Sequence, residues 1–136
     1  MNVDSILISE YATVDNVGRL TVVNVFNKIN GPGPWAIPFF SISMVIHGHE
    51  KEAQTHHEGE IILLDSERER VKEDPIPFEF TFPKKSKNTP GMPVRFVVNL
   101  MIAGLVFERP GPYAFEVHID GTYHASASLF IARTEA

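Results

Sequence analysis

The sequence predicts an all-β fold, an antiparallel sandwich of about eight strands. Ten phenylalanines and many valines and isoleucines favour strands over helices. Ten prolines and nine glycines divide the chain into many short elements. No window shows the sustained 3.6-residue period of an amphipathic helix. An Ig-like or a C2-like sandwich fits this pattern, and a closed barrel is the alternative that the strand count leaves open.

Eight apolar runs define the expected strands. In the third run, Phe40, Ile42 and Met44 alternate with serines, which is typical of a strand with one buried face. The same period of two extends from Tyr113 to Ile119. The expected strands cover residues 3–12, 19–27, 40–46, 57–65, 76–82, 94–107, 113–119 and 123–131.

Turn-forming residues separate these strands. Residues 15–18 end in glycine and favour a tight turn, so the first two strands form a hairpin. The segment 30–35 contains two prolines, which lack backbone donors, and it predicts a loop or a connection that crosses a sheet edge. Three prolines in and beside the strand at 76–82 favour a position at a sheet edge. The Asp-Gly pair at 120–121 is the strongest hairpin signal.

Length and composition limit the classes of function. A chain of 136 residues has the length of one domain, so we expect residues 1–136 to form a single sandwich. A net charge of −5 disfavours nucleic acid and anionic membranes as main partners. Because the chain has no cysteine, disulfides, thiol nucleophiles and thiolate zinc sites are excluded. Residues 1–5 lack the basic segment of a signal peptide, and we expect a cytoplasmic protein.

Three short motifs occur in order along the chain. They are YATVD at 11–15 with GRL at 18–20, IILLD at 61–65, and RPGPYAFEV at 109–117 with DG at 120–121. Together they resemble an uncharacterised family of small bacterial proteins whose first hairpin has the form YA..D..G+L. The resemblance implies a β-sandwich, and it implies neither an activity nor any functional residue.

Histidines provide the first candidate site. His47 and His49 lie two positions apart on an expected strand and therefore share a face. If the next strand pairs with this one, His56 or His57 comes opposite, and only one of the two faces the same way. The pattern makes His47, His49 and His57 a candidate zinc or nickel site. The alternative is a solvated sheet face whose clustered histidines titrate near neutral pH.

The single tryptophan provides the second candidate site. Trp35 lies in a loop rich in glycine and proline, next to a strand rich in phenylalanine. An exposed tryptophan stacks on sugar rings or fills a partner's pocket, so carbohydrate binding through Trp35 is a candidate function. The alternative is a ring that covers the open end of the core.

Other polar groups indicate structural roles. Single aspartates near strand ends, without an Asp-x-Asp pair, favour turn formation over a calcium site. Lys84, Lys85 and Lys87 form one basic loop, which is too little basic surface for nucleic-acid binding. No Gly-x-Ser-x-Gly elbow, phosphate-binding loop or distinct carboxylate pair occurs.

These observations predict a non-enzymatic protein without a cofactor, acting as a structural or protein-binding module. Sandwiches offer strand edges and flat faces to a protein partner or to a second copy, so a homodimer is one expected form. The metal-binding protein built on His47, His49 and His57 is the rival from another class.

Overall fold

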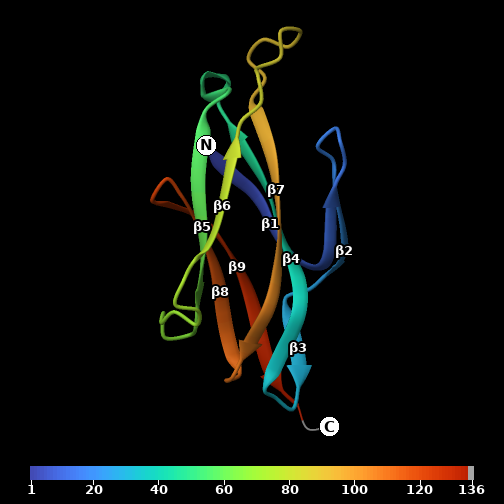
Figure 1. Cartoon of the computed structure of the whole chain (residues 1–136), viewed down its shortest axis with the longest axis vertical. Coiled ribbons are helices and arrows are strands. Elements are labelled where there is room, and N and C mark those ends of the chain that lie inside the picture. The colour runs from blue at the N-terminus through green and yellow to red at the C-terminus, as the bar shows by residue number, and fades with distance from the viewer. Residues whose placement is uncertain (135–136) are drawn as a thin grey trace.

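The computed structural model describes residues 1–134 and folds them into two packed β-sheets (Figure 1). These residues form nine strands and one short 3-10 helix, η1. The elements are β1 (Asn2–Val14), β2 (Leu20–Val25), β3 (Lys28–Gly31), β4 (Trp35–Gly48), η1 (Glu50–Glu52), β5 (His56–Leu64), β6 (Ile76–Thr81), β7 (Val94–Phe107), β8 (Gly111–Ile119) and β9 (Thr122–Arg133).

The strands form an open sandwich, which confirms the predicted fold class. One sheet has the order β2-β1-β4-β7 and the other has the order β3-β9-β8-β5-β6. All pairs are antiparallel except β3 and β9, which run parallel. Each sheet keeps two free edges, so the alternative of a closed barrel is not realised.

The predicted loop at 30–35 is wrong at both of its ends. Asn30 and Gly31 belong to β3, the ninth strand, because the backbone before Pro32 still has its donors and pairs with β9. Trp35 already belongs to β4, where it lies opposite Phe107 of β7. The prolines therefore shorten the connection instead of keeping the whole segment out of the sheets.

The core lies between the sheets and follows the alternation read from the sequence. Every second residue of β4 from Phe40 to Ile46 points inward and is at most 1% exposed. Tyr113 and every second residue after it also point inward on β8, with Tyr113 6% exposed and the others at most 1%. Near one side of the sandwich, Phe80 of β6 stacks on Phe96 of β7 with ring centroids 5.5 Å apart. β6 and β7 belong to different sheets, so this aromatic contact joins the sheets without backbone hydrogen bonds.

Strand β1 changes partners along its length. Its first part pairs with β4 as far as Ser9, and its second part pairs with β2. Figure 1 shows the resulting hairpin standing beside the sandwich, at the right of the view. Asn99 of β7 donates from Nδ2 to the carbonyl of Ala12 over 2.9 Å, and its Oδ1 accepts from Ser43. These hydrogen bonds fasten the hairpin to β4 and β7.

Two local structures fix the last hairpin, which the sequence predicted. The Tyr113 hydroxyl donates to the carbonyl of Arg109 over 2.5 Å, and burial raises the pKa of this phenol. At the β8–β9 turn, Asp120 and Gly121 have φ values of 52° and 81°. A two-residue type I′ turn requires positive φ at both positions, and aspartate and glycine tolerate it.

The four sheet edges differ in how they are protected. β6 has six residues and includes Pro77, and it forms an edge as its prolines predicted. β2 and β3 have six and four residues. β7 has fourteen residues, and Arg95 is the one charged residue among them. The β7 edge is therefore long, apolar and free of proline.

Candidate functional site

The three predicted metal ligands lie in different places. His47 points from the four-stranded sheet toward the carboxylate of Asp4. His49 follows the end of β4 and caps η1, where its Nδ1 accepts from the backbone of Lys51 over 3.1 Å. His57 belongs to the five-stranded sheet and stacks on Phe80.

The predicted site on His47, His49 and His57 is therefore wrong. β4 ends at Gly48, so His49 no longer shares a sheet face with His47. β5 pairs with β6 and β8 and not with β4, so no histidine of β5 comes opposite His47.

Of the two alternatives for Trp35, the structure supports the ring packed on the core and not the exposed ring. Its side chain is 4% exposed and belongs to the core. The guanidinium of Arg133 lies over the ring, 5.1 Å from its centroid. A Cβ atom at Gly33 would come within 2.9 Å of the ring, so this glycine allows the loop to close on it. A ring covered on both sides cannot stack on a sugar.

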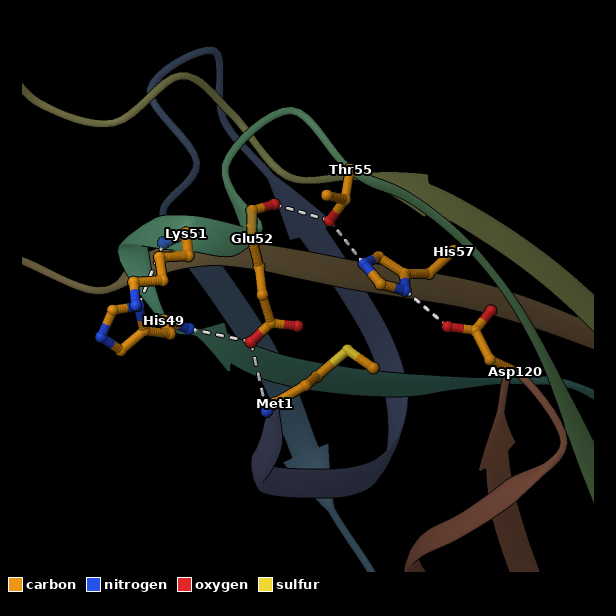
Figure 2. Close-up of polar contacts among 7 residues, drawn as sticks. All are labelled: Met1, His49, Lys51, Glu52, Thr55, His57 and Asp120. Atoms are coloured by element: carbon orange, nitrogen blue, oxygen red, sulfur yellow. Dashed lines mark hydrogen bonds and ion pairs between the residues drawn. The ribbon is translucent and has the colours of Figure 1, made fainter.

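A chain of polar contacts runs across one end of the sandwich (Figure 2). His57 Nδ1 lies 2.6 Å from Asp120 Oδ2, and its Nε2 lies 2.7 Å from Thr55 Oγ1. The Asp120 carboxylate also accepts from the backbone of Glu58 over 3.1 Å. The hydrogen bond from His57 is the main reason that the pKa of Asp120 lies below its ordinary value.

The order carboxylate, imidazole, hydroxyl is that of a hydrolase triad, but the hydroxyl has a further partner. Thr55 Oγ1 lies 2.6 Å from the carbonyl of Glu52, which can only accept a hydrogen bond. The Thr55 hydroxyl is therefore shared between this carbonyl and Nε2 of His57. The contacts fasten the turn after η1 to β5 and to the β8–β9 turn.

Glu52 makes further polar contacts at the same end of the molecule (Figure 2). Its Oε1 accepts from the backbone of His49 over 3.0 Å and lies 3.3 Å from the amino group of Met1. These contacts lower the pKa of Glu52, the backbone hydrogen bond of His49 most of all. The aspartates at other turns act as the sequence predicted, since Asp15 and Asp65 each accept two backbone hydrogen bonds with Oδ1.

A concave surface with acidic side chains lies on the outer side of β5 and β6. We call it the acidic face, and its members are His56, Glu58, Glu60 and Glu79. A cavity of about 760 Å³ borders it, and His118 and Asp120 also line this cavity. The residues around this cavity include four carboxylates and neither lysine nor arginine. The electrostatic potential of the cavity therefore favours cations.

Three members of the acidic face converge. Glu58 on β5 lies directly opposite Glu79 on β6, and His56 lies two residues before Glu58 on the same face. His56 Nε2 is 3.5 Å from Glu79 Oε2, and its Nδ1 is 2.8 Å from the hydroxyl of Thr81. One ligand atom from each of His56, Glu58 and Glu79 lies within 4.8 Å of the others. The sequence alone does not reveal this group, because the register between β5 and β6 is needed to find it.

A further acidic residue on the outer side of this sheet, Glu116 of β8, is already paired. Glu116 is 9% exposed and receives the guanidinium of Arg68 at 2.7 Å. His118 Nε2 lies 3.4 Å from its second carboxylate oxygen. The uncompensated charge of this sheet is therefore concentrated on the acidic face.

The β7 edge is the second candidate for an interaction. Met101 and Val106 are 51% and 47% exposed. A cavity of about 500 Å³ lies beside its residues 96–100, between the β1–β2 hairpin and β6. Within residues 1–134, β7 pairs with β4 alone, so the backbone groups on its other side have no strand partner.

The fold and these surfaces define the class of protein, an all-β sandwich. The chain belongs to a particular family within it, because the model described as "Family of unknown function (DUF6941)" matches residues 4–132. The expected membership of an uncharacterised family is thereby confirmed. A search of curated proteins finds no match. Among residues 1–134, no helix has the length and apolar character needed to cross a membrane.

Proposed function

We propose that this protein is a non-enzymatic binding module that associates with a second copy of itself through the β7 edge. The observation that supports the proposal is the contrast among the sheet edges. Three edges are short or contain proline, whereas β7 offers fourteen residues with a single charge. Long apolar edges without lysine or proline add further strands readily.

A second copy suits this edge because antiparallel pairing of β7 with itself is self-complementary. The pairing repeats the same backbone hydrogen bonds about a two-fold axis, which is the symmetry of most dimers. In an antiparallel pair of two β7 strands, Arg95 lies opposite Arg95 of the second copy only if the two-fold axis passes at this residue. If the axis passes nearer the middle of the strand, no like charges lie opposite each other. The cavity beside residues 96–100 leaves room for an added strand.

Three other features of the protein support further parts of the proposal. The hydrogen bond from Tyr113 to Arg109 supports an Ig-like type of sandwich. The Thr55 hydroxyl is held by the carbonyl of Glu52 as well as by His57, which supports a structural role for these contacts and a function without catalysis. An acidic chain without cysteine is compatible with a bacterial cytoplasmic protein that binds neither nucleic acid nor membranes.

Light scattering after size exclusion tests the association. We expect a concentration-dependent species of twice the 15.2 kDa of one chain. Met101→Lys places a charge at the edge and is expected to give monomers. Val25→Lys is the matched control, since Val25 is 54% exposed on β2 and Met101 is 51% exposed. A wild-type monomer at every concentration would overturn the proposal.

Disulfide trapping locates the contact, because the chain contains no cysteine of its own. At the centre of an antiparallel β7 pair a residue faces its own copy at about 4.5–5.5 Å between Cα atoms, which permits a disulfide. We expect mild oxidation to cross-link at least one of Asn99→Cys, Met101→Cys and Ala103→Cys, and not Val25→Cys. Equal cross-linking of Val25→Cys would show that another surface is used.

A further inference from the structure

The acidic face places two like charges in direct opposition. Glu58 and Glu79 are cross-strand partners on the solvent side of β5 and β6. Like charges directly opposite each other destabilise an antiparallel pair. No lysine or arginine lines the neighbouring cavity to offset them. A bound cation between the two carboxylates would turn this repulsion into attraction.

His56 adds an imidazole to the carboxylates of the acidic face. In the tautomer that donates from Nδ1 to Thr81 Oγ1, the lone pair lies on Nε2. That nitrogen is the one directed toward Glu79, 3.5 Å away. A hydrogen bond from the far ring nitrogen is the usual means by which proteins orient a histidine ligand and fix its tautomer. Thr81 performs this task from the same strand as Glu79.

The distances suit a small tetrahedral ion. Zinc binds imidazole nitrogen and carboxylate oxygen at about 2.0–2.2 Å, so two neighbouring ligand atoms lie roughly 3.4 Å apart. The 3.5 Å between His56 Nε2 and Glu79 Oε2 fits this spacing. Glu58 completes the group, with all three ligand atoms within 4.8 Å of one another.

We propose that His56, Glu58 and Glu79 bind a zinc ion on the outer side of β5 and β6. The ligands lie on the sheet that does not contain β7, although Glu79 also lines the cavity beside residues 96–100 of β7. Imidazole together with carboxylates favours zinc over magnesium, which prefers oxygen ligands in octahedral geometry.

Calorimetric titration of the untagged, metal-free protein with zinc chloride tests the proposal. We expect one zinc ion per chain, and at least a tenfold loss of affinity in His56→Gln and in Glu79→Gln. Glu67→Gln is the matched control, because Glu67 is exposed and lies in the loop between β5 and β6. Far-ultraviolet circular dichroism of each variant checks that the fold is kept.

Magnesium chloride supplies the arm that distinguishes a histidine–carboxylate site from a general acidic surface. We expect magnesium to bind at least tenfold more weakly than zinc and to be insensitive to His56→Gln. Equal affinity for the two ions would overturn the proposal. So would the absence of zinc binding, or zinc binding that both ligand variants leave unchanged.

Discussion

His57 Nδ1 lies 2.6 Å from Asp120 Oδ2, and this contact joins the start of β5 to the turn between β8 and β9. The histidine ring is mostly buried against Phe80, whereas the carboxylate is about half exposed. Asp120 therefore connects the packed end of the sandwich to the wall of the cavity beside the acidic face.

Asp120→Asn removes the charge and leaves the turn intact, because asparagine also tolerates the positive φ of this position. We expect the free energy of unfolding at pH 6 to fall by no more than about 1 kcal/mol, since water screens a half-exposed pair. The pKa of Asp120 is lowered in the folded state, so its contribution is present above the ordinary aspartate pKa.

That contribution is lost as the pH falls through the lowered pKa of Asp120. Denaturant unfolding from pH 6 down to pH 2 should show the wild type and Asp120→Asn converging in the acid range. Asp74→Asn, in an exposed loop, is expected to match the wild type throughout. A constant difference between Asp120→Asn and the wild type at every pH would contradict the assigned cause.

Gly59→Ala is expected to destabilise the fold strongly, by about 1–3 kcal/mol. A Cβ atom at this position would lie 2.2 Å from Cζ of Phe78, whose ring fills the space beside β5. Phe78→Leu in the same chain shortens the side chain and should restore part of the loss. Chemical denaturation of the two single variants and the double variant measures the coupling, and strictly additive losses would argue against a direct clash.

Tyr113→Phe deletes the hydroxyl that donates to the Arg109 carbonyl. We expect a loss of about 1 kcal/mol, the typical contribution of one such hydrogen bond. Tyr123→Phe serves as the control, because Tyr123 is 53% exposed. The melting temperatures of the two variants are compared. Equal values would show that the hydrogen bond from Tyr113 to Arg109 does not contribute to stability.

Trp35 is the single tryptophan, so its fluorescence reports on one position. Because the ring is 4% exposed, we expect blue-shifted emission, weak quenching by iodide and no response to oligosaccharides. Gly33→Ala introduces a Cβ atom within 2.9 Å of the ring at a φ of 72°, and should shift the emission to the red. Strong quenching of the wild type would contradict the buried position.

Glu79→Gln should stabilise the metal-free protein, because it removes the repulsion from Glu58 across the strand pair. Both side chains are exposed, so the gain lies at the lower end of about 0.2–1 kcal/mol. Melting in the presence of a chelator isolates this effect from metal binding. If Glu79→Gln melted at a lower temperature than the wild type under these conditions, the two carboxylates would not repel each other as described.

The parts of the fold that sequence predicted are those set by neighbouring residues. The alternation from Tyr113 to Ile119 and the turn at 120–121 depend on local preference and burial, and both are present. The edge position of β6 follows from its prolines. β3 was missed because four residues next to a proline-rich turn become a strand only when β9 lies beside them.

The candidate site could not be predicted for a related reason. Whether His47 and His49 share a face depends on where β4 ends, and whether His57 joins them depends on which sheet contains β5. Glu58 lies opposite Glu79 because of the register between β5 and β6, and a loop of many residues separates these two strands. Turn chemistry does not set the register across such a loop.

The parallel pairing of β3 with β9 has a consequence for how the protein is made. Arg133 Nη1 donates to the carbonyl of Pro32 across 101 positions of the chain, and the β3–β9 hydrogen bonds have a similar separation. Pairings this distant in sequence form late, and parallel ones are intrinsically slow. On the ribosome, β3 and the segment around Trp35 reach their final contacts only after almost all of the described chain has emerged. During synthesis, the nascent protein therefore exposes its tryptophan and one open sheet edge to whatever chaperones are nearby.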